Sequence, residues 1–150
     1  MAASDAAVLE SVKRTDSAIT LLQAAIAAQS IKIGNGEVQA PRAPEFAFDD
    51  YFAFVRAWNE YKSSVRWNVS FTWNMVQFLD GIADYYRRNE TWREQAENKL
   101  GLAKQSVPSL PPTVPTAEER KNATTYPYEG AIKIGAIFGI LYLIVRVIRP

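Results

Sequence analysis

Apolar residues near the N-terminus recur at alternating intervals of four and three positions, the spacing that keeps them on one face of an α-helix. This seam consists of Val8, Val12, Thr15, Ile19, Leu22 and Ile26. The pattern predicts a helix over residues 5–30, with Ser4 or Asp5 able to cap its first turn. It fits two arrangements equally well: a coiled coil with another chain, or packing against a helix of the same chain.

The next segment, residues 31–39, alternates apolar and polar positions around a Gly-Asn-Gly sequence, which predicts a short β-hairpin. Two glycines with this spacing also begin the phosphate-binding fingerprint of dinucleotide-binding folds. However, Gln39 occupies the third glycine position, and Pro41 follows where a helix would have to begin. We therefore exclude a nucleotide site and expect no cofactor.

A long amphipathic pattern predicts a second helix over residues 44–87. Either this helix is continuous, or it breaks near Ser63–Ser64 or Asp80–Gly81. Its main seam has the width of a bundle helix and therefore belongs to a core. The seam consists of Phe48, Tyr51, Val55, Trp58, Lys62, Val65, Val69, Thr72, Val76, Leu79, Ala83 and Tyr86.

A second aromatic face lies opposite this seam and consists of Trp67, Phe71, Phe78 and Tyr85. A helix that is apolar on two faces must bury both of them. One interpretation is that the first and third helices cover this face. The other is a contact surface for a partner or for lipid headgroups, because aromatic side chains supply much of the energy of protein interfaces. We expect these four residues to bind neighbouring subunits.

A third helix is predicted over residues 90–104, with Asn89 as its cap. Glu90, Glu94 and Glu97 share one face of it, but no histidine or other strong metal ligand accompanies them. We interpret this face as solvated and expect no metal site.

Proline then becomes frequent, with four prolines in residues 107–115. Such a segment is extended and semi-rigid, so residues 107–128 are predicted to form a spacer that holds a helical head domain, residues 1–106, away from the C-terminal segment. The alternative is a ligand for a proline-recognition domain.

The C-terminal segment, residues 129–150, is predicted to form a single transmembrane helix. Between residues 131 and 148 the only charges are Lys133 and Arg146, and eighteen helical residues span about 27 Å, close to the thickness of a bilayer's hydrocarbon core. The two charges fall on different sides of the helix, so they define no polar face and can reach the headgroups. The alternative is a buried core helix, because the strictly uncharged run covers only residues 134–145.

Within this span Gly135 and Gly139 form a GxxxG motif, which lets two membrane helices approach closely. We expect a set of aromatic and basic residues at the membrane interface. They are Tyr126, Tyr128, Lys133, Arg146 and Arg149. The N-terminus lacks the apolar stretch of a signal peptide, so the layout is that of a tail-anchored, single-pass membrane protein. Positive charge is nearly balanced across the span, which leaves the topology open.

The amino-acid composition excludes several classes of function. With 17 basic and 16 acidic residues the net charge is +1, and no basic stripe points to nucleic acid. The chain has no cysteine and no histidine, so disulfides, thiolate sites and the usual general base are excluded. We expect no catalytic residue and no small-molecule substrate. Carboxylate chemistry near Asp49–Asp50 is the remaining enzymatic alternative.

Taken together, the sequence predicts an all-α protein with a three-helix head, a Pro-rich spacer and one C-terminal transmembrane helix. The first functional hypothesis is a non-catalytic structural subunit of a multi-subunit membrane complex, either an energy-transducing complex or the membrane layer of a lipid-containing virion. Its partners would be the lipid bilayer and other subunits or further copies of the chain. The second hypothesis is a tail-anchored adaptor that recruits a soluble partner to a membrane.

Overall fold

The computed structural model describes residues 5–68, 76–104 and 110–123, and no strand occurs among them. In chain order the helices are α1 (Asp5–Gly34), the short 3-10 helix η1 (Ala43–Glu45), α2 (Phe48–Asn68), α3 (Val76–Leu100) and α4 (Ala117–Ala123). The all-α class predicted for the head is confirmed over these residues.

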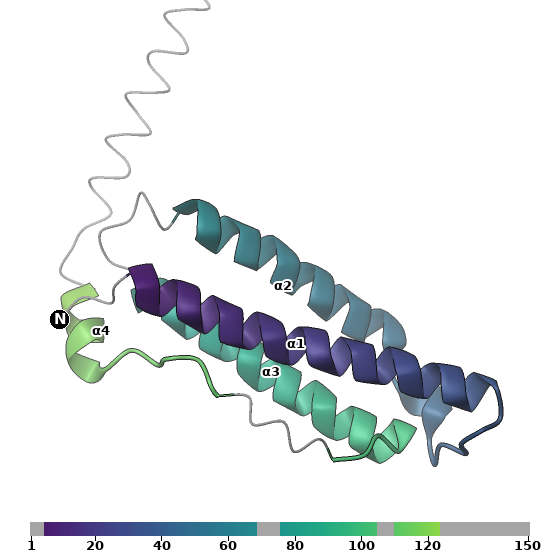
Figure 1. The fold of residues 1–150 in the computed structure, drawn as a ribbon. Helices are drawn as coiled ribbons and strands as arrows, with labels where there is room; N and C mark the ends of the chain where they lie inside the picture. The colour runs from purple at the N-terminus through teal and green to yellow at the C-terminus, as the bar shows by residue number, and fades with distance from the viewer. Residues whose placement is uncertain (1–4, 69–75, 105–109, 124–150) are drawn as a thin grey trace, which may run out of the picture.

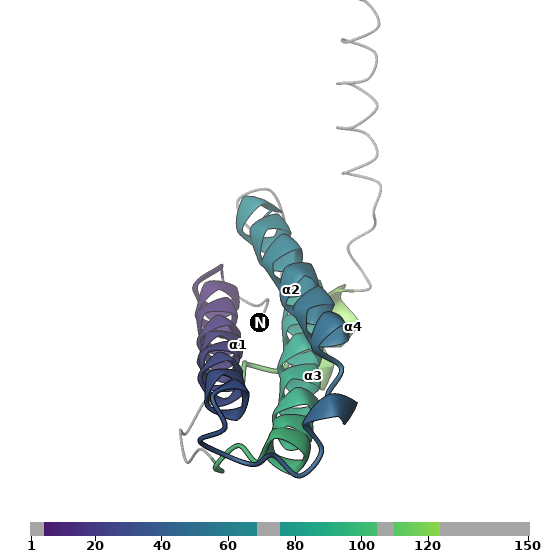
Figure 2. The ribbon, with the colours of Figure 1, turned by 90° about the vertical axis from the view of Figure 1, so that its right-hand side faces the viewer.

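The three long helices form a bundle in which α1 and α3 run in the same direction and α2 runs antiparallel to both (Figures 1 and 2). Where α1 and α3 end, the Gln29 amide donates a hydrogen bond of 2.9 Å to the Leu100 carbonyl. Towards the opposite end, the hydroxyl of Tyr61, late in α2, donates to the carbonyl of Phe78, early in α3. Polar contacts therefore set the register of the helices at both ends.

The predicted seam of α1 faces the interior of this bundle. All six of its members are buried: Val8, Val12, Thr15, Ile19, Leu22 and Ile26. Packing within the chain accounts for the heptad spacing, so the seam needs no second chain to bury it. The bundle core is completed by side chains of α2 and α3, including Trp58, Leu79 and Ile82.

The prediction of a β-hairpin near residues 31–39 is wrong, because α1 continues into this segment and ends at Gly34. The helix ends in a Schellman motif, in which the Glu37 amide donates to the Lys32 carbonyl and the Gly36 amide to the Ile33 carbonyl. Gly36 has a φ of +74°, the left-handed conformation that this motif requires. The Asn-Gly sequence thus stops a helix and does not turn a hairpin.

The second and third predicted helices are divided differently in the structure. α2 ends at Asn68, and α3 begins at Val76 and passes through residues 80–81, so neither Ser63–Ser64 nor Asp80–Gly81 is a break. Asn89, the predicted cap of a separate helix, is buried in the middle of α3. α3 ends at Leu100, four residues before the predicted position, and Gly101 follows with a φ of +66°.

The Pro-rich segment lies against the bundle over the residues that the structure describes. Residues 110–116, which we call the strap, run back along α1 and α3 to α4 (Figure 1). Thr116 caps α4 in a reciprocal capping box, since its hydroxyl accepts the Glu119 amide while its own amide donates to the Glu119 carboxylate. These bonds to the Thr116 amide and hydroxyl hold the pKa of Glu119 below its ordinary value. Over residues 110–123 the arrangement thus differs from a spacer that stands free of the helices.

Candidate functional site

Aromatic rings fill the seam between α2 and α3. The ring centroids of Trp58 and Tyr85 are 5.3 Å apart, and those of Tyr51 and Trp92 are 5.5 Å apart. The tilted and edge-on arrangements are those that the ring quadrupoles favour. We call this set the aromatic cluster; it consists of Phe46, Phe48, Tyr51, Phe54, Trp58, Tyr61, Tyr85 and Trp92.

The phenol groups of the cluster are tied to backbone carbonyls or buried. The hydroxyl of Tyr85 donates to the Ala57 carbonyl over 3.3 Å, which joins α3 to α2. Burial, followed by the neighbouring Tyr85 and Asp80, raises the pKa of Tyr61 to about 12. Burial alone raises the pKa of Tyr51. At neutral pH both phenols are uncharged, so they act in packing and hydrogen bonding and are poor candidates for proton transfer.

The side of the cluster that faces solvent is covered by a cation. The Arg88 guanidinium lies 5.2 Å from the ring centroid of Phe54 and 5.2 Å from that of Tyr85. Such cation–π contacts contribute about 0.5–1 kcal/mol each at exposed sites. Arg88 therefore shields aromatic surface that would otherwise face water.

Of the four predicted partner-binding residues, the structure describes the side chains of Phe78 and Tyr85. Phe78 and Tyr85 are half-buried and pack against the core of the bundle. Trp67 belongs to the last turn of α2, and Phe71 lies outside the described residues. Tyr85 packs against rings of α2, which was predicted as part of the same helix, and not against the first or third predicted helix, the cover weighed as the alternative. A role in partner binding stays a prediction.

A polar clip joins α1 to α2. One carboxylate oxygen of Asp16 accepts hydrogen bonds from the indole Nε1 of Trp58, over 2.9 Å, and from the Lys62 ammonium, over 2.6 Å. Lys62 and Asp16 are both partly shielded from solvent, which makes this pair stronger than a fully exposed one. The clip holds α2 to α1 at one level of the bundle.

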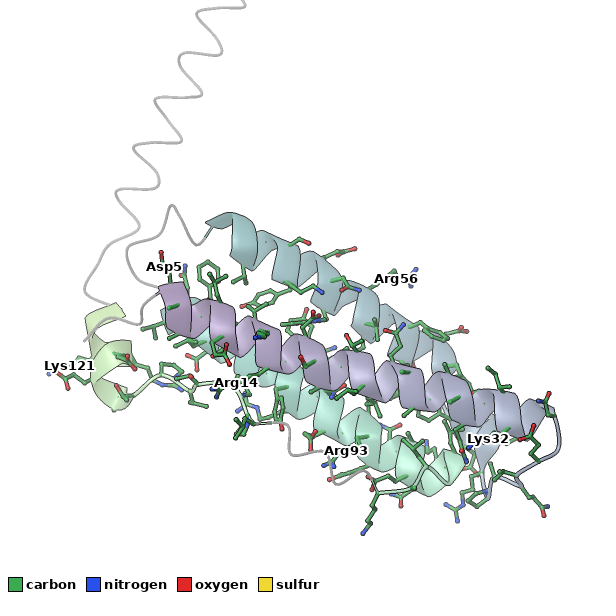
Figure 3. All side chains as sticks on the ribbon, viewed as in Figure 1. Asp5, Arg14, Lys32, Arg56, Arg93 and Lys121 are labelled. Atoms are coloured by element: carbon green, nitrogen blue, oxygen red, sulfur yellow. The ribbon has the colours of Figure 1, made fainter. Side chains whose placement is uncertain are left out.

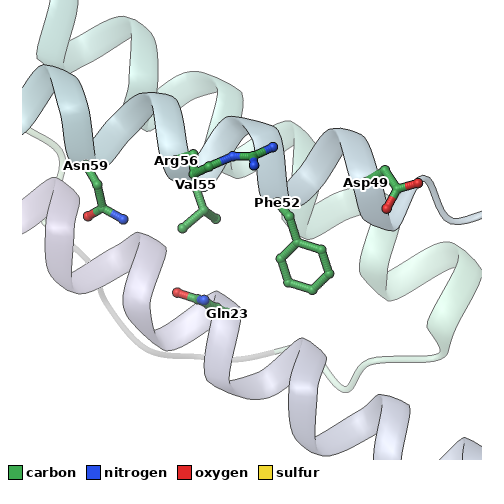
Figure 4. A pocket seen from close by; sticks show the side chains of 6 residues that line it. All are labelled: Gln23, Asp49, Phe52, Val55, Arg56 and Asn59. Atoms are coloured by element: carbon green, nitrogen blue, oxygen red, sulfur yellow. The ribbon is translucent and has the colours of Figure 1, made fainter.

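Beyond this clip the two helices diverge and leave an open groove of about 530 Å³ (Figure 4). It is lined by Gln23 of α1 and by Asp49, Phe52, Val55, Arg56 and Asn59 of α2. The Phe52 ring points towards α1 and remains 50% exposed. An exposed aromatic ring with amides and charges of both signs around it is the composition of a protein-contact surface.

The acidic residues that could have carried catalysis do not assemble a metal site. No group of three or more acidic side chains among the described residues is arranged to hold a metal ion. Asp49 lines the groove, while Asp50 is exposed beside it at the start of α2. The groove is a candidate surface for binding.

The predicted membrane elements fall outside the described residues. They are Tyr126, Tyr128, Lys133, Gly135, Gly139, Arg146 and Arg149. Among the helices that the structure describes, none combines the length and the apolar character needed to span a bilayer.

Sequence reasoning missed the groove and the strap contacts. Phe52 lies off the main seam of its helix, and this offset was the available signal for an outward-facing ring. Comparison with known proteins adds no further guide: no protein-family model, curated protein or solved structure matches the chain.

Proposed function

We propose that this chain is a non-catalytic structural subunit of a multi-subunit membrane assembly, anchored by residues 131–148. The observation that carries the proposal is the run of eighteen residues with charges only near its two ends, a length and pattern suited to a bilayer span. The helical head would then lie at the membrane surface and contact its neighbours.

The α1–α2 groove supports the second part of the proposal, contact with neighbouring subunits. A half-exposed Phe52 beside Arg56 offers an apolar anchor and a cation of the kind that dominate interface energies. A helix of a neighbouring subunit is the natural occupant, because a groove between two helices fits an amphipathic helix.

The lack of both histidine and cysteine supports a non-catalytic role, since it removes the residues used most often as bases, nucleophiles and metal ligands. The raised pKa of Tyr61 and of Tyr51 leaves these buried phenols protonated under ordinary conditions. Burial in the packed bundle thus accounts for the raised pKa of these two tyrosines, without a catalytic role.

The test is extraction of membranes with a mild detergent, followed by native sizing and mass spectrometry of the proteins that co-migrate. The subunit proposal expects a large species of fixed composition that Phe52→Ser disrupts. Leu110→Ser is the matched control, because Leu110 is equally apolar, 62% exposed and lies on the strap away from the groove. A monomer in a micelle would contradict the subunit role, and recovery without detergent would contradict the anchor.

A tail-anchored adaptor is the second candidate, and the completeness of the core favours it. The bundle buries its own large side chains, including Trp58 and Tyr51, without a second chain. A head that folds alone suits a protein that binds its partner reversibly. This candidate predicts a stable monomer in detergent with a free groove, whereas a subunit should lose stability when separated from its neighbours.

A further inference from the structure

The buried residues of the strap are three positions apart. Pro112 and Pro115 are buried, whereas Leu110 and Val114 are 62% and 56% exposed. Burial of every third residue is the period of a polyproline II helix, the conformation that Pro-x-x-Pro ligands present to their binding surfaces. The sequence Pro112-Thr-Val-Pro115 is thus already docked, and the surface that receives it belongs to the same chain.

Two side chains of α1 form hydrogen bonds with the backbone of the strap. The buried hydroxyl of Ser11 accepts a hydrogen bond of 3.0 Å from the Thr113 amide, between the two prolines. Arg14, one turn further along α1, extends its guanidinium to the Pro111 carbonyl at 3.5 Å (Figure 3). Side chains of α1 therefore form hydrogen bonds with both a backbone amide and a backbone carbonyl of the strap, as in the recognition of an extended peptide.

The C-terminal end of the strap is held by Arg120, through one exposed and one partly buried contact. Arg120, just after the strap, pairs with Asp80 of α3 at 2.8 Å, and both side chains are about half exposed. Its Nε also donates to the Pro115 carbonyl, so the same residue stiffens the strap from within. Exposed ion pairs contribute little free energy, so the segment can leave its surface without unfolding the bundle.

We propose that this α1 surface is a docking site for a Pro-x-x-Pro segment, and that the strap of a second copy of the chain takes the place that the chain's own strap occupies in the monomer. The second copy is the occupant because its strap reproduces every contact just described, which is the condition for exchange of an element between protomers. Nine residues, 101–109, separate α3 from Leu110 and can reach about 30 Å, several helix radii. The inference does not depend on the membrane anchor.

The natural lack of cysteine allows a direct test with the full-length chain in non-ionic detergent. One chain carries Ser11→Cys, with Pro112→Gly and Pro115→Gly to vacate its own docking surface. The other carries Thr113→Cys and an otherwise native strap. Far-UV circular dichroism of each chain checks that the bundle is folded. The two are mixed, oxidised, and examined for a disulfide-linked pair by non-reducing electrophoresis and mass spectrometry.

Exchange predicts a linked pair whose yield falls about tenfold when the first chain keeps its prolines, because its own strap then competes at millimolar effective concentration. The matched control moves the second cysteine to the adjacent Val114, which is 56% exposed. Linkage through Thr113→Cys that exceeds linkage through Val114→Cys supports the proposal. Equal yields at the two positions would indicate random collision and overturn it. A double variant with Ser11→Cys and Thr113→Cys that closes only within one chain, together with no linked pair in the mixture, would overturn it as well.

Discussion

α2 and α3 meet through a continuous cluster of aromatic rings, whereas the strap meets the same bundle through two buried prolines and a few polar contacts. Ring burial removes a large apolar area from water and scales with that area. The strap contributes two buried prolines and no aromatic ring, and its Arg120–Asp80 ion pair is exposed to solvent. The two regions should therefore differ in stability even though they belong to one fold.

This difference separates two roles within the chain. The aromatic cluster fixes the fold, because loss of a ring there leaves a cavity that the neighbouring helices fill only in part. The strap can open locally while the helices stay folded, since segments with few buried contacts open at a small fraction of the global free energy. Segments that exchange between two copies of a chain are expected to be of this weakly held kind, like the strap.

The largest effect is expected for Trp58→Ala, in the centre of the aromatic cluster. The side chain is 1% exposed, and its removal should lower the free energy of unfolding by about 3–5 kcal/mol. Urea unfolding followed by circular dichroism measures this loss. Trp58→Phe is the control: it keeps an aromatic ring but removes the hydrogen bond to Asp16, so it should cost less. A loss below about 1 kcal/mol for Trp58→Ala would mean that the cluster does not fix the fold.

The next effect is expected for Gly81→Ala, where α3 passes the ring of Tyr61. A Cβ built on Gly81 would overlap the Tyr61 hydroxyl and lie 2.7 Å from its ring carbon Cζ. We expect a loss of about 1–3 kcal/mol, even though alanine favours a helix over glycine by about 1 kcal/mol. In a Tyr61→Ala background the overlap disappears, so the same substitution should become neutral or stabilising. A loss that persists in this background would show that a Tyr61 clash is not its cause.

A smaller effect concerns alkaline pH. Burial, followed by the neighbouring Tyr85 and Asp80, raises the pKa of Tyr61 from its ordinary value of 10.0 to about 12 in the folded bundle. The folded state therefore retains this proton where the unfolded state has lost it, so the contribution to stability is complete below pH 10 and is lost as the pH rises through 12. Thermal unfolding between pH 9 and 12 should show a falling midpoint, with a shallower fall in Tyr61→Phe. Ultraviolet absorbance titration should show the corresponding late phenolate. An identical slope in the variant would assign the pH effect to other groups.

Hydrophobic spacing predicted more of this fold than of its interaction surfaces. The seam of α1 marks the buried face because a 3.6-residue period and burial have the same cause. The end of α1 was missed because Asn35-Gly36 serves both a hairpin and a helix stop, and only the tertiary context selects between them. The sequence predicts Asn89 as a cap because a polar residue before a charged run has the same local pattern whether it is exposed or buried. The docked strap was missed because its partner, Ser11, is about a hundred residues away in sequence and has no local signal.

The smallest effect on the free energy of unfolding is expected for Arg120→Ala. This variant should nevertheless distinguish the strap from the aromatic cluster most clearly. Because the Arg120–Asp80 pair is exposed, its loss should change the free energy of unfolding by no more than about 1 kcal/mol. The Thr113 amide, which is bonded to Ser11, should nevertheless exchange its hydrogen severalfold faster, since the strap opens without the helices. Hydrogen exchange measured by mass spectrometry separates the strap from α2 and α3. Arg87→Ala removes an exposed ion pair on α3 that does not involve the strap, and it should leave exchange at Thr113 unchanged. If Arg120→Ala left Thr113 protected, contacts other than those of Arg120 would hold the strap in place, and the ion pair would have no part in closing it.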